Sequence, residues 1–105
     1  MHTNQLELVG SLHERSPLRL SPAAVPIVDC WIEHRSTQIE AGQQRQVTAQ
    51  VRSVAIGPLA EQLDKLPLGQ LARFTGFLAT PVQRKGVSSA PRLVFHLQAF
   101  QLLNQ

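Results

Sequence analysis

The segment "GPLAEQLDKLP", residues Gly57–Pro67, carries the one helical pattern in the chain. Pro58 suits the first turn of a helix, where its missing N–H leaves no hydrogen bond unmade, and Pro67 ends the pattern. The leucines that share one face of this helix are Leu59, Leu63 and Leu66. We therefore expect a single short helix whose leucine face covers a core.

Three segments before this helix alternate apolar and polar residues, as half-buried strands do. They span residues 6–12, 27–35 and 45–56. Gly10 predicts a bend inside the first strand, and an apolar pattern that slips near Ser53 predicts a bulge or a strong coil in the third. The stretch Arg15–Pro26 holds three prolines and is predicted to be an irregular loop, and Ser36–Gln44 a polar connection.

Two more strands are predicted after the helix, over residues 69–79 and 92–103. An order of three strands, one helix and two strands matches the OB-fold, an all-β, five-stranded Greek-key barrel with its helix between strands 3 and 4. Closure into a barrel also explains Gly10 and Gly76, because sharply coiled strands need corners without a Cβ atom. An open sheet covered by one helix is the alternative, but it would expose one face to water. The last strand does not suit such a sheet, because it is apolar on both faces. We expect one OB-fold domain over residues 1–105.

Positive charge is concentrated in the last third of the chain. Residues 1–64 carry five arginines against seven acids, whereas residues 65–105 carry five cations and no acid, so the net charge of +3 is unevenly distributed. The densest basic run is "TPVQRKGVSSAPR", Thr80–Arg92. This pattern is compatible with an anionic partner, nucleic acid above all, and equally with ordinary solubilising charge.

OB-folds bind oligonucleotides or oligosaccharides on the face of strands 2 and 3, flanked by the loops between strands 1 and 2 and strands 4 and 5. Most cations of the chain fall in those two loops or at the ends of the connection between strands 2 and 3, so we expect the barrel to gather them into one positive track along its rim. They are Arg15, Arg19, Arg35, Arg45, Arg84, Lys85 and Arg92.

Aromatic platforms for base stacking are few, because the chain has one tryptophan, four phenylalanines and no tyrosine. Trp31 and Phe77 lie on mixed strand faces, where stacking on a base, packing at a subunit interface or burial are all open. The other phenylalanines are expected in the core. With so few platforms, binding should be mainly electrostatic and weaken steeply with salt.

Catalytic and metal-binding patterns are missing from the sequence. The four histidines have no metal-ligand spacing, no serine lies in a nucleophile elbow, and no glycine-rich phosphate loop occurs. Cys30 is the only cysteine and is expected to be a buried, unreactive thiol. We expect a protein without enzymatic activity, cofactor or metal, and without a signal peptide or membrane span, hence a cytoplasmic one.

The stretch "WIEHRSTQIEAGQQRQ", Trp31–Gln46, resembles the family of primosomal replication protein N (PriB), whose bacterial members carry an E-H-R-S run, then Q-x-E-A-G, then R-Q. Further pieces resemble that family in the same order, so the resemblance covers nearly the whole chain. They are "TNQLELVG", "SPLR", "TGF" and the basic loop before "LVFHLQ". The family is a paralogue of the bacterial single-stranded DNA-binding proteins.

The resemblance implies an OB-fold homodimer that binds single-stranded DNA during replication restart and stabilises the primosomal helicase on forked DNA. The partners it implies are the PriA helicase, single-stranded DNA-binding protein and, in some bacteria, DnaT. Carried over by position, the DNA-contacting residues are Arg35, Arg45, Arg84 and Lys85. Arg92 is a looser match because the loop length differs.

The chain departs from some relatives at three positions. Gln43 and Thr48 stand where they have an aromatic residue and a tryptophan, and Leu20 stands where they have a lysine. Weaker DNA binding, or transfer of the stacking role to Trp31 or Phe77, is the hypothesis that follows. The alternative function is an OB-fold protein-interaction module whose basic loop docks an acidic peptide, with DNA binding incidental.

Overall fold

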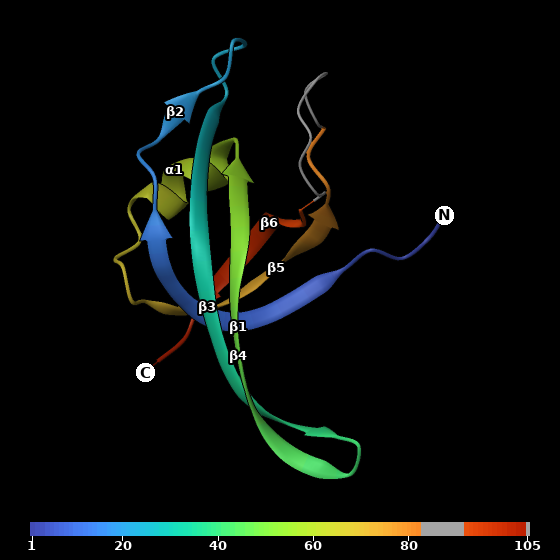
Figure 1. The fold of residues 1–105 in the computed structure, drawn as a ribbon. Helices are drawn as coiled ribbons and strands as arrows, with labels where there is room; N and C mark the ends of the chain where they lie inside the picture. Colours follow the sequence, from blue (N-terminus) through green and yellow to red (C-terminus); the bar gives the residue numbers. More distant parts are fainter. Residues whose placement is uncertain (83–91, 105) are drawn as a thin grey trace.

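The computed structural model describes residues 1–82 and 92–104, which form six strands and one helix (Figure 1). In chain order the elements are β1 (Leu6–Arg15), β2 (Arg19–Leu20), β3 (Pro26–Glu40), β4 (Gln43–Ile56), α1 (Pro58–Asp64), β5 (Leu71–Ala79) and β6 (Val94–Leu102). The predicted all-β architecture is confirmed.

The strands close into a barrel. Their order in the sheet is β1-β5-β6-β4-β3-β2, and β1 also pairs with β3, which joins the two ends of the five long strands. Every pairing is antiparallel except the one between β4 and β6, where Ser53 lies opposite Phe95. This is the OB-fold expected from the element order, with α1 between the third and fourth long strands.

The irregular loop predicted over Arg15–Pro26 contains a strand, so that part of the prediction is wrong. β2 pairs Arg19 with Ile27 and Leu20 with Pro26 at the start of β3. Because β2 is counted, α1 follows the fourth strand in chain order rather than the third. Pro17 and Pro22 flank β2, and prolines predict irregular structure. A pairing of two residues is also too short to leave a periodic pattern in the sequence.

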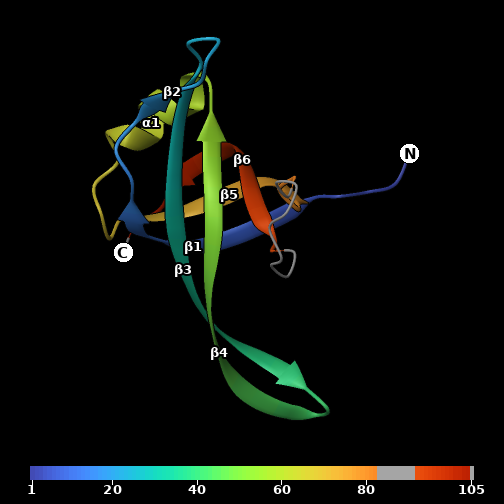
Figure 2. The same cartoon turned by 45° about the horizontal axis from the view of Figure 1, so that its top comes forward.

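The polar connection predicted over Ser36–Gln44 is also wrong, because these residues continue the two strands. The β3–β4 ladder runs from Ile27 opposite Ile56 to Glu40 opposite Gln43. Only Ala41 and Gly42 form the turn, with φ values of 54° and 78°. Figures 1 and 2 show this hairpin projecting beyond the barrel. Both faces of its tip contact water, so its strands show no apolar alternation.

The bulge predicted near Ser53 does not form against β3, whose register with β4 is continuous. Ser53 faces the core and is fully buried, and its hydroxyl donates to the Val51 carbonyl at 3.1 Å. A buried serine at an inward position is what made the apolar side seem to slip, because a satisfied hydroxyl is tolerated in a core.

The core lies inside the barrel and under α1. Its largest fully buried side chains are Phe74, Phe95, Leu12, Ile32, Leu63 and Val28. At Gly10 a Cβ atom would lie 2.5 Å from the Glu33 carbonyl oxygen, and at Gly76 it would overlap the His96 carbonyl. β1 passes from pairing with β5 to pairing with β3 just after Gly10, so the predicted barrel corner is confirmed.

The helix closes one end of the barrel as its leucine face predicted. Ala60 and Leu63 are fully buried, and Pro58 occupies the first turn. The Arg15 guanidinium, at the end of β1, donates to the carbonyls of Leu63 and Leu66 and so ties the end of the helix to the barrel. Within residues 1–82 and 92–104, no helix is both long and apolar enough to cross a membrane.

Candidate nucleic-acid interface

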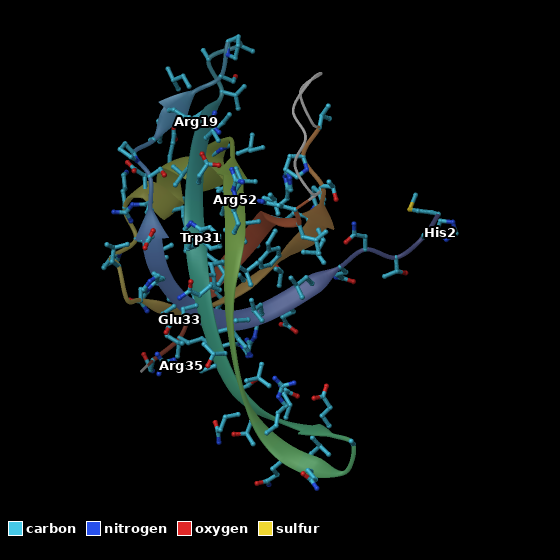
Figure 3. The ribbon with its side chains drawn as sticks, in the orientation of Figure 1. His2, Arg19, Trp31, Glu33, Arg35 and Arg52 are labelled. Carbon is cyan, nitrogen blue, oxygen red and sulfur yellow. The ribbon has the colours of Figure 1, made fainter. Side chains whose placement is uncertain are left out.

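Trp31 occupies the outer surface of β3, between two strands that place charged residues beside it. It lies opposite Glu14 on β1 and opposite Arg52 on β4. Directly paired residues point to the same face of a sheet, so these three side chains share one surface. Trp31 is 39% exposed, which is unusual for so large an apolar side chain. Figure 3 shows Trp31 and Arg52 side by side on the barrel.

A groove of about 560 Å³ runs over this surface. Its lining comes from β1, β3, β4 and the residues just before β6. The charged side chains and the indole among the lining residues are Glu14, Arg15, Asp29, Trp31, Arg52 and Arg92. Because the groove combines an exposed indole with three arginines, it has the composition that single-stranded nucleic acid requires.

The three arginines of this groove differ in how free their charges are. Arg15 is used to hold the end of α1. Arg52 and Arg92 are exposed and have no carboxylate partner among residues 1–82 and 92–104. These two guanidinium groups are therefore the ones that can bind a phosphate without first releasing another partner. Arg92 was predicted as a site residue, whereas Arg52 was not.

Arg19, Arg35 and Arg45, which the sequence also predicted, each form an ion pair with a nearby acid. The pairs are Arg19–Asp29 at 3.0 Å, Arg35–Glu33 at 3.0 Å and Arg45–Glu40 at 2.7 Å. Exposed ion pairs of this kind contribute about 0–1 kcal/mol, so a phosphate can replace the carboxylate at small cost. Arg19 does not line the groove itself, although its partner Asp29 does.

Arg35 and Arg45 point to opposite faces of the hairpin. Arg35 lies opposite Thr48, whereas Arg45 lies opposite Gln38, and 35 and 38 differ by an odd number along β3. Successive residues of a strand alternate between faces, so the two arginines are not brought onto one surface. Of the predicted site residues, the structure brings Trp31 and Arg92 together in the groove and leaves Arg35 and Arg45 apart from each other.

Phe77 lies away from Trp31, on the outer surface of β5. Its ring stacks on the His96 ring across the β5–β6 pair, with centroids 4.9 Å apart and an interplanar angle of 9°. One face of Phe77 is thus covered, and its strand pairs with β1 and β6 but not with β3. Arg84 and Lys85, the remaining predicted residues, lie outside the residues that the structure describes.

Glu14 and Arg52 are charged groove residues that were not among the predicted site residues. Arg52 is an outward residue of a predicted strand, so its exposure could be predicted, whereas Glu14 lies beyond the end of the predicted first strand. Their places beside Trp31 could not be predicted, because they depend on which residues of β1 and β4 lie opposite residue 31. The β1–β3 register also shifts between Leu12 and Glu14, and no local sequence pattern predicts this shift.

Cys30 lies under the groove and is 3% exposed. Burial, followed by the nearby Asp29 charge, raises the pKa of its thiol from 9.0 to about 12, while Arg15 acts in the opposite direction. The thiol is therefore protonated at neutral pH, and the predicted burial is confirmed. Across the described part of the chain, no group of histidine, cysteine and acidic residues is arranged to hold a metal ion.

Comparisons with known proteins place this fold and surface in a family. Residues 4–99 match the model of a family described as another single-strand binding protein family. Replication restart protein PriB of Bordetella pertussis is 36% identical over 95 residues, which are 90% of this chain and 84% of the relative.

Two solved structures extend the match to three dimensions. The PriB protein of Ralstonia solanacearum superposes with a TM-score of 0.81 and 34% identity, over 98% of this chain and all of that one. The single-stranded DNA binding protein of Thermus aquaticus gives 0.80 and 26%, over 97% of this chain and 50% of that one. The chain therefore belongs to the PriB family of replication restart proteins, within the single-strand binding proteins of the OB-fold.

Proposed function

We propose that the protein binds single-stranded DNA as a non-enzymatic accessory protein of replication restart. The observation that carries this proposal is the groove that exposed Trp31 lines together with Arg52 and Arg92. An indole can stack on any base and free guanidinium groups can bind the flanking phosphates, so such a groove binds single strands with little dependence on sequence. Its position on β3 and β4 is the ligand-binding face of OB-folds.

The groove also supports the transfer of the stacking role to Trp31. Thr48, which replaces a tryptophan of some relatives, lies opposite Arg35 and therefore shares the outer face of the β3–β4 ladder with Trp31. The indole of Trp31 therefore lies on the same face as residue 48. Phe77 is the weaker candidate, because His96 already covers one side of its ring.

In replication restart the protein acts as a homodimer that stabilises PriA on forked DNA, with DnaT and single-stranded DNA-binding protein as further partners. The names of its relatives support a role in replication restart. Two barrels side by side would join their grooves and basic loops, Arg84 and Lys85 included, into one binding path. Arg35 and Arg45 extend this path along the two faces of the hairpin. Sedimentation of the protein with and without oligonucleotide measures the dimer directly.

The test is the binding of a fluorescent oligo-dT, followed by anisotropy, to the parent and to Trp31→Ala and Phe77→Ala. Stacking on one aromatic contributes about 1–3 kcal/mol, so we expect Trp31→Ala to weaken binding by about fivefold or more and Phe77→Ala to have a smaller effect. Trp31 is the only tryptophan, so quenching of the parent's own fluorescence reports contact at this site. Absence of binding by the parent would sink the proposal.

The second candidate function is a protein-interaction module with incidental DNA binding. It is favoured by the ion pairs of Arg19, Arg35 and Arg45, which leave fewer free charges for phosphate than the sequence suggests. An acidic peptide that displaces oligo-dT at equal salt, and binds more tightly than it, would establish this function in place of the first.

A further inference from the structure

Trp31 separates two opposite charges that do not pair with each other. Glu14 lies beside it on β1 and Arg52 on its other side on β4, and all three line the groove. We propose that this arrangement is a base-recognition subsite that prefers guanine, set within the single-strand binding surface. The inference rests on the proposed function, since it concerns which base the same groove holds best.

The charges of Glu14 and Arg52 are free, in contrast to those around them. Further along β3, Asp29 is held by Arg19, and Glu33 is held by Arg35. In the described part of the chain, no lysine or arginine pairs with the Glu14 carboxylate, and the His13 Nε2 lies 3.9 Å from its Oε1, too far for a hydrogen bond. Arg52 has no acidic partner there either. The two groups nearest Trp31 are thus the ones left available to a ligand.

Guanine has the complementary set of hydrogen-bonding groups. Its N1–H and N2 amino group are neighbouring donors that a carboxylate accepts together, and its O6 and N7 are the acceptors that arginine binds in a bidentate manner. Adenine and cytosine offer a carboxylate an amino group but no second donor beside it. Thymine has an N3–H between two carbonyl oxygens, which repel a carboxylate.

The spacing suits a base that is stacked on the indole. Neighbouring strands lie about 4.8 Å apart, so the backbones at Glu14 and Arg52 are about 10 Å from each other with Trp31 between them. Both side chains are long enough to reach inward over the ring from either side. A guanine on Trp31 could therefore place its N1 and N2 edge toward Glu14 and its O6 and N7 edge toward Arg52.

The experiment compares dT oligonucleotides that carry one central replacement, either guanine, hypoxanthine or adenine, at constant salt. One guanine in a dT strand cannot fold into a quadruplex, and hypoxanthine differs from guanine only in lacking the N2 amino group. We expect the guanine strand to bind about fivefold to tenfold more tightly than all-dT, and hypoxanthine to lose most of that gain. The readout is the Kd ratio from competition anisotropy.

The matched variants are Glu14→Gln and Glu61→Gln, which each remove one exposed carboxylate. Glu61 lies in α1 and does not line the groove. Glu14→Gln should reduce the guanine preference to less than about twofold while strengthening oligo-dT binding, because a negative charge leaves the groove. Glu61→Gln should keep the preference. Equal affinities for guanine and dT strands, or a preference that survives Glu14→Gln, overturn this inference but leave the proposed function standing. If the parent protein binds none of these oligonucleotides, the proposed function is overturned instead.

Discussion

Residues 30 and 31 show how neighbours on one strand acquire opposite roles. Trp31 points outward between Glu14 and Arg52, while Cys30 points into the core. The alternation of a strand places one side chain in the groove and the next beneath it. Substitutions at these two positions should therefore affect different properties, binding for Trp31 and stability for Cys30.

The buried thiol of Cys30 predicts how stability depends on alkaline pH. The folded-state pKa of about 12 lies above the unfolded value of 9.0, so the unfolded chain releases its proton first as pH rises. Stability from this residue is complete below pH 9 and is lost as pH rises toward 12. We expect Cys30→Ala to lose less stability than the parent between pH 9 and 11, as measured by urea unfolding.

The quantity to compare is the slope of the free energy of unfolding against pH. Absolute stabilities differ in any case, because the alanine variant leaves a small cavity and starts from lower stability. Lysine and other groups that titrate in this range are common to both proteins and cancel in the comparison. Identical slopes for the parent and Cys30→Ala would show that the thiol is not deprotonated more easily in the unfolded state.

At the scale of elements, the β3–β4 hairpin is unusual because its tip has no core to hold it. β1 pairs with β3 only as far as Glu33, and β6 pairs with β4 only at Ser53 and Val54. Beyond these points the hairpin depends on its own ladder and turn. His34 joins its base to the barrel, with its Nδ1 2.7 Å from the Val9 carbonyl oxygen and its Nε2 2.7 Å from the Ser36 hydroxyl.

The turn of this hairpin can be improved by one substitution. Ala41 adopts φ 54° ahead of Gly42 at 78°, and an alanine in this left-handed region is strained by about 1 kcal/mol. Asn-Gly is the preferred pair for a two-residue hairpin turn of this hand. We expect Ala41→Asn to stabilise the protein by about 0.5–1 kcal/mol, as measured by urea unfolding, and to slow amide hydrogen exchange in residues 36–47.

Gly42→Ala is the opposite change at the same turn. No atom lies within 4 Å of the added methyl group, so any loss of stability comes from the positive φ alone. We expect a loss of about 1 kcal/mol. If Ala41→Asn and Gly42→Ala leave both unfolding and exchange unchanged, the hairpin tip does not adopt this turn in solution.

At the scale of the whole molecule, closure of the barrel decides which charges act together. The groove joins residues from three strands and from the segment just before β6 that are far apart in sequence, such as Glu14, Arg52 and Arg92. The hairpin, by contrast, carries Arg35 and Arg45 to opposite faces. Charge alone therefore does not define the binding surface.

This difference predicts the salt dependence of DNA binding. Each phosphate neutralised on a single strand contributes about 0.7 to the slope of log K against log salt. Because Arg52 and Arg92 are free, we expect Arg52→Gln and Arg92→Gln each to reduce the magnitude of the slope by roughly 0.7. Arg73→Gln is the matched control, since Arg73 pairs with Glu7 on β1 and does not line the groove. A slope that changes equally in all three variants would contradict the assignment of Arg52 and Arg92 as phosphate-binding residues.

Local patterns were enough to predict the class of the protein. The leucine face and two prolines of Gly57–Pro67 predicted the helix, and apolar alternation or, for the last strand, a continuous apolar run predicted the five long strands, because each signal comes from neighbours along the chain. The same applies to Cys30, Phe74 and Phe95, whose apolar surroundings predicted burial.

What local patterns could not predict depends on pairing between distant strands. The position of Glu14 and Arg52 beside Trp31 follows from strand register, and the short β2 strand and the long hairpin follow from ladders with no apolar period. Register and closure are set by the sum of many contacts across the barrel, which no window of sequence contains. For that reason the cations could be named from the sequence, but which of them stay free and which pair with an acid emerged only when the strands came together.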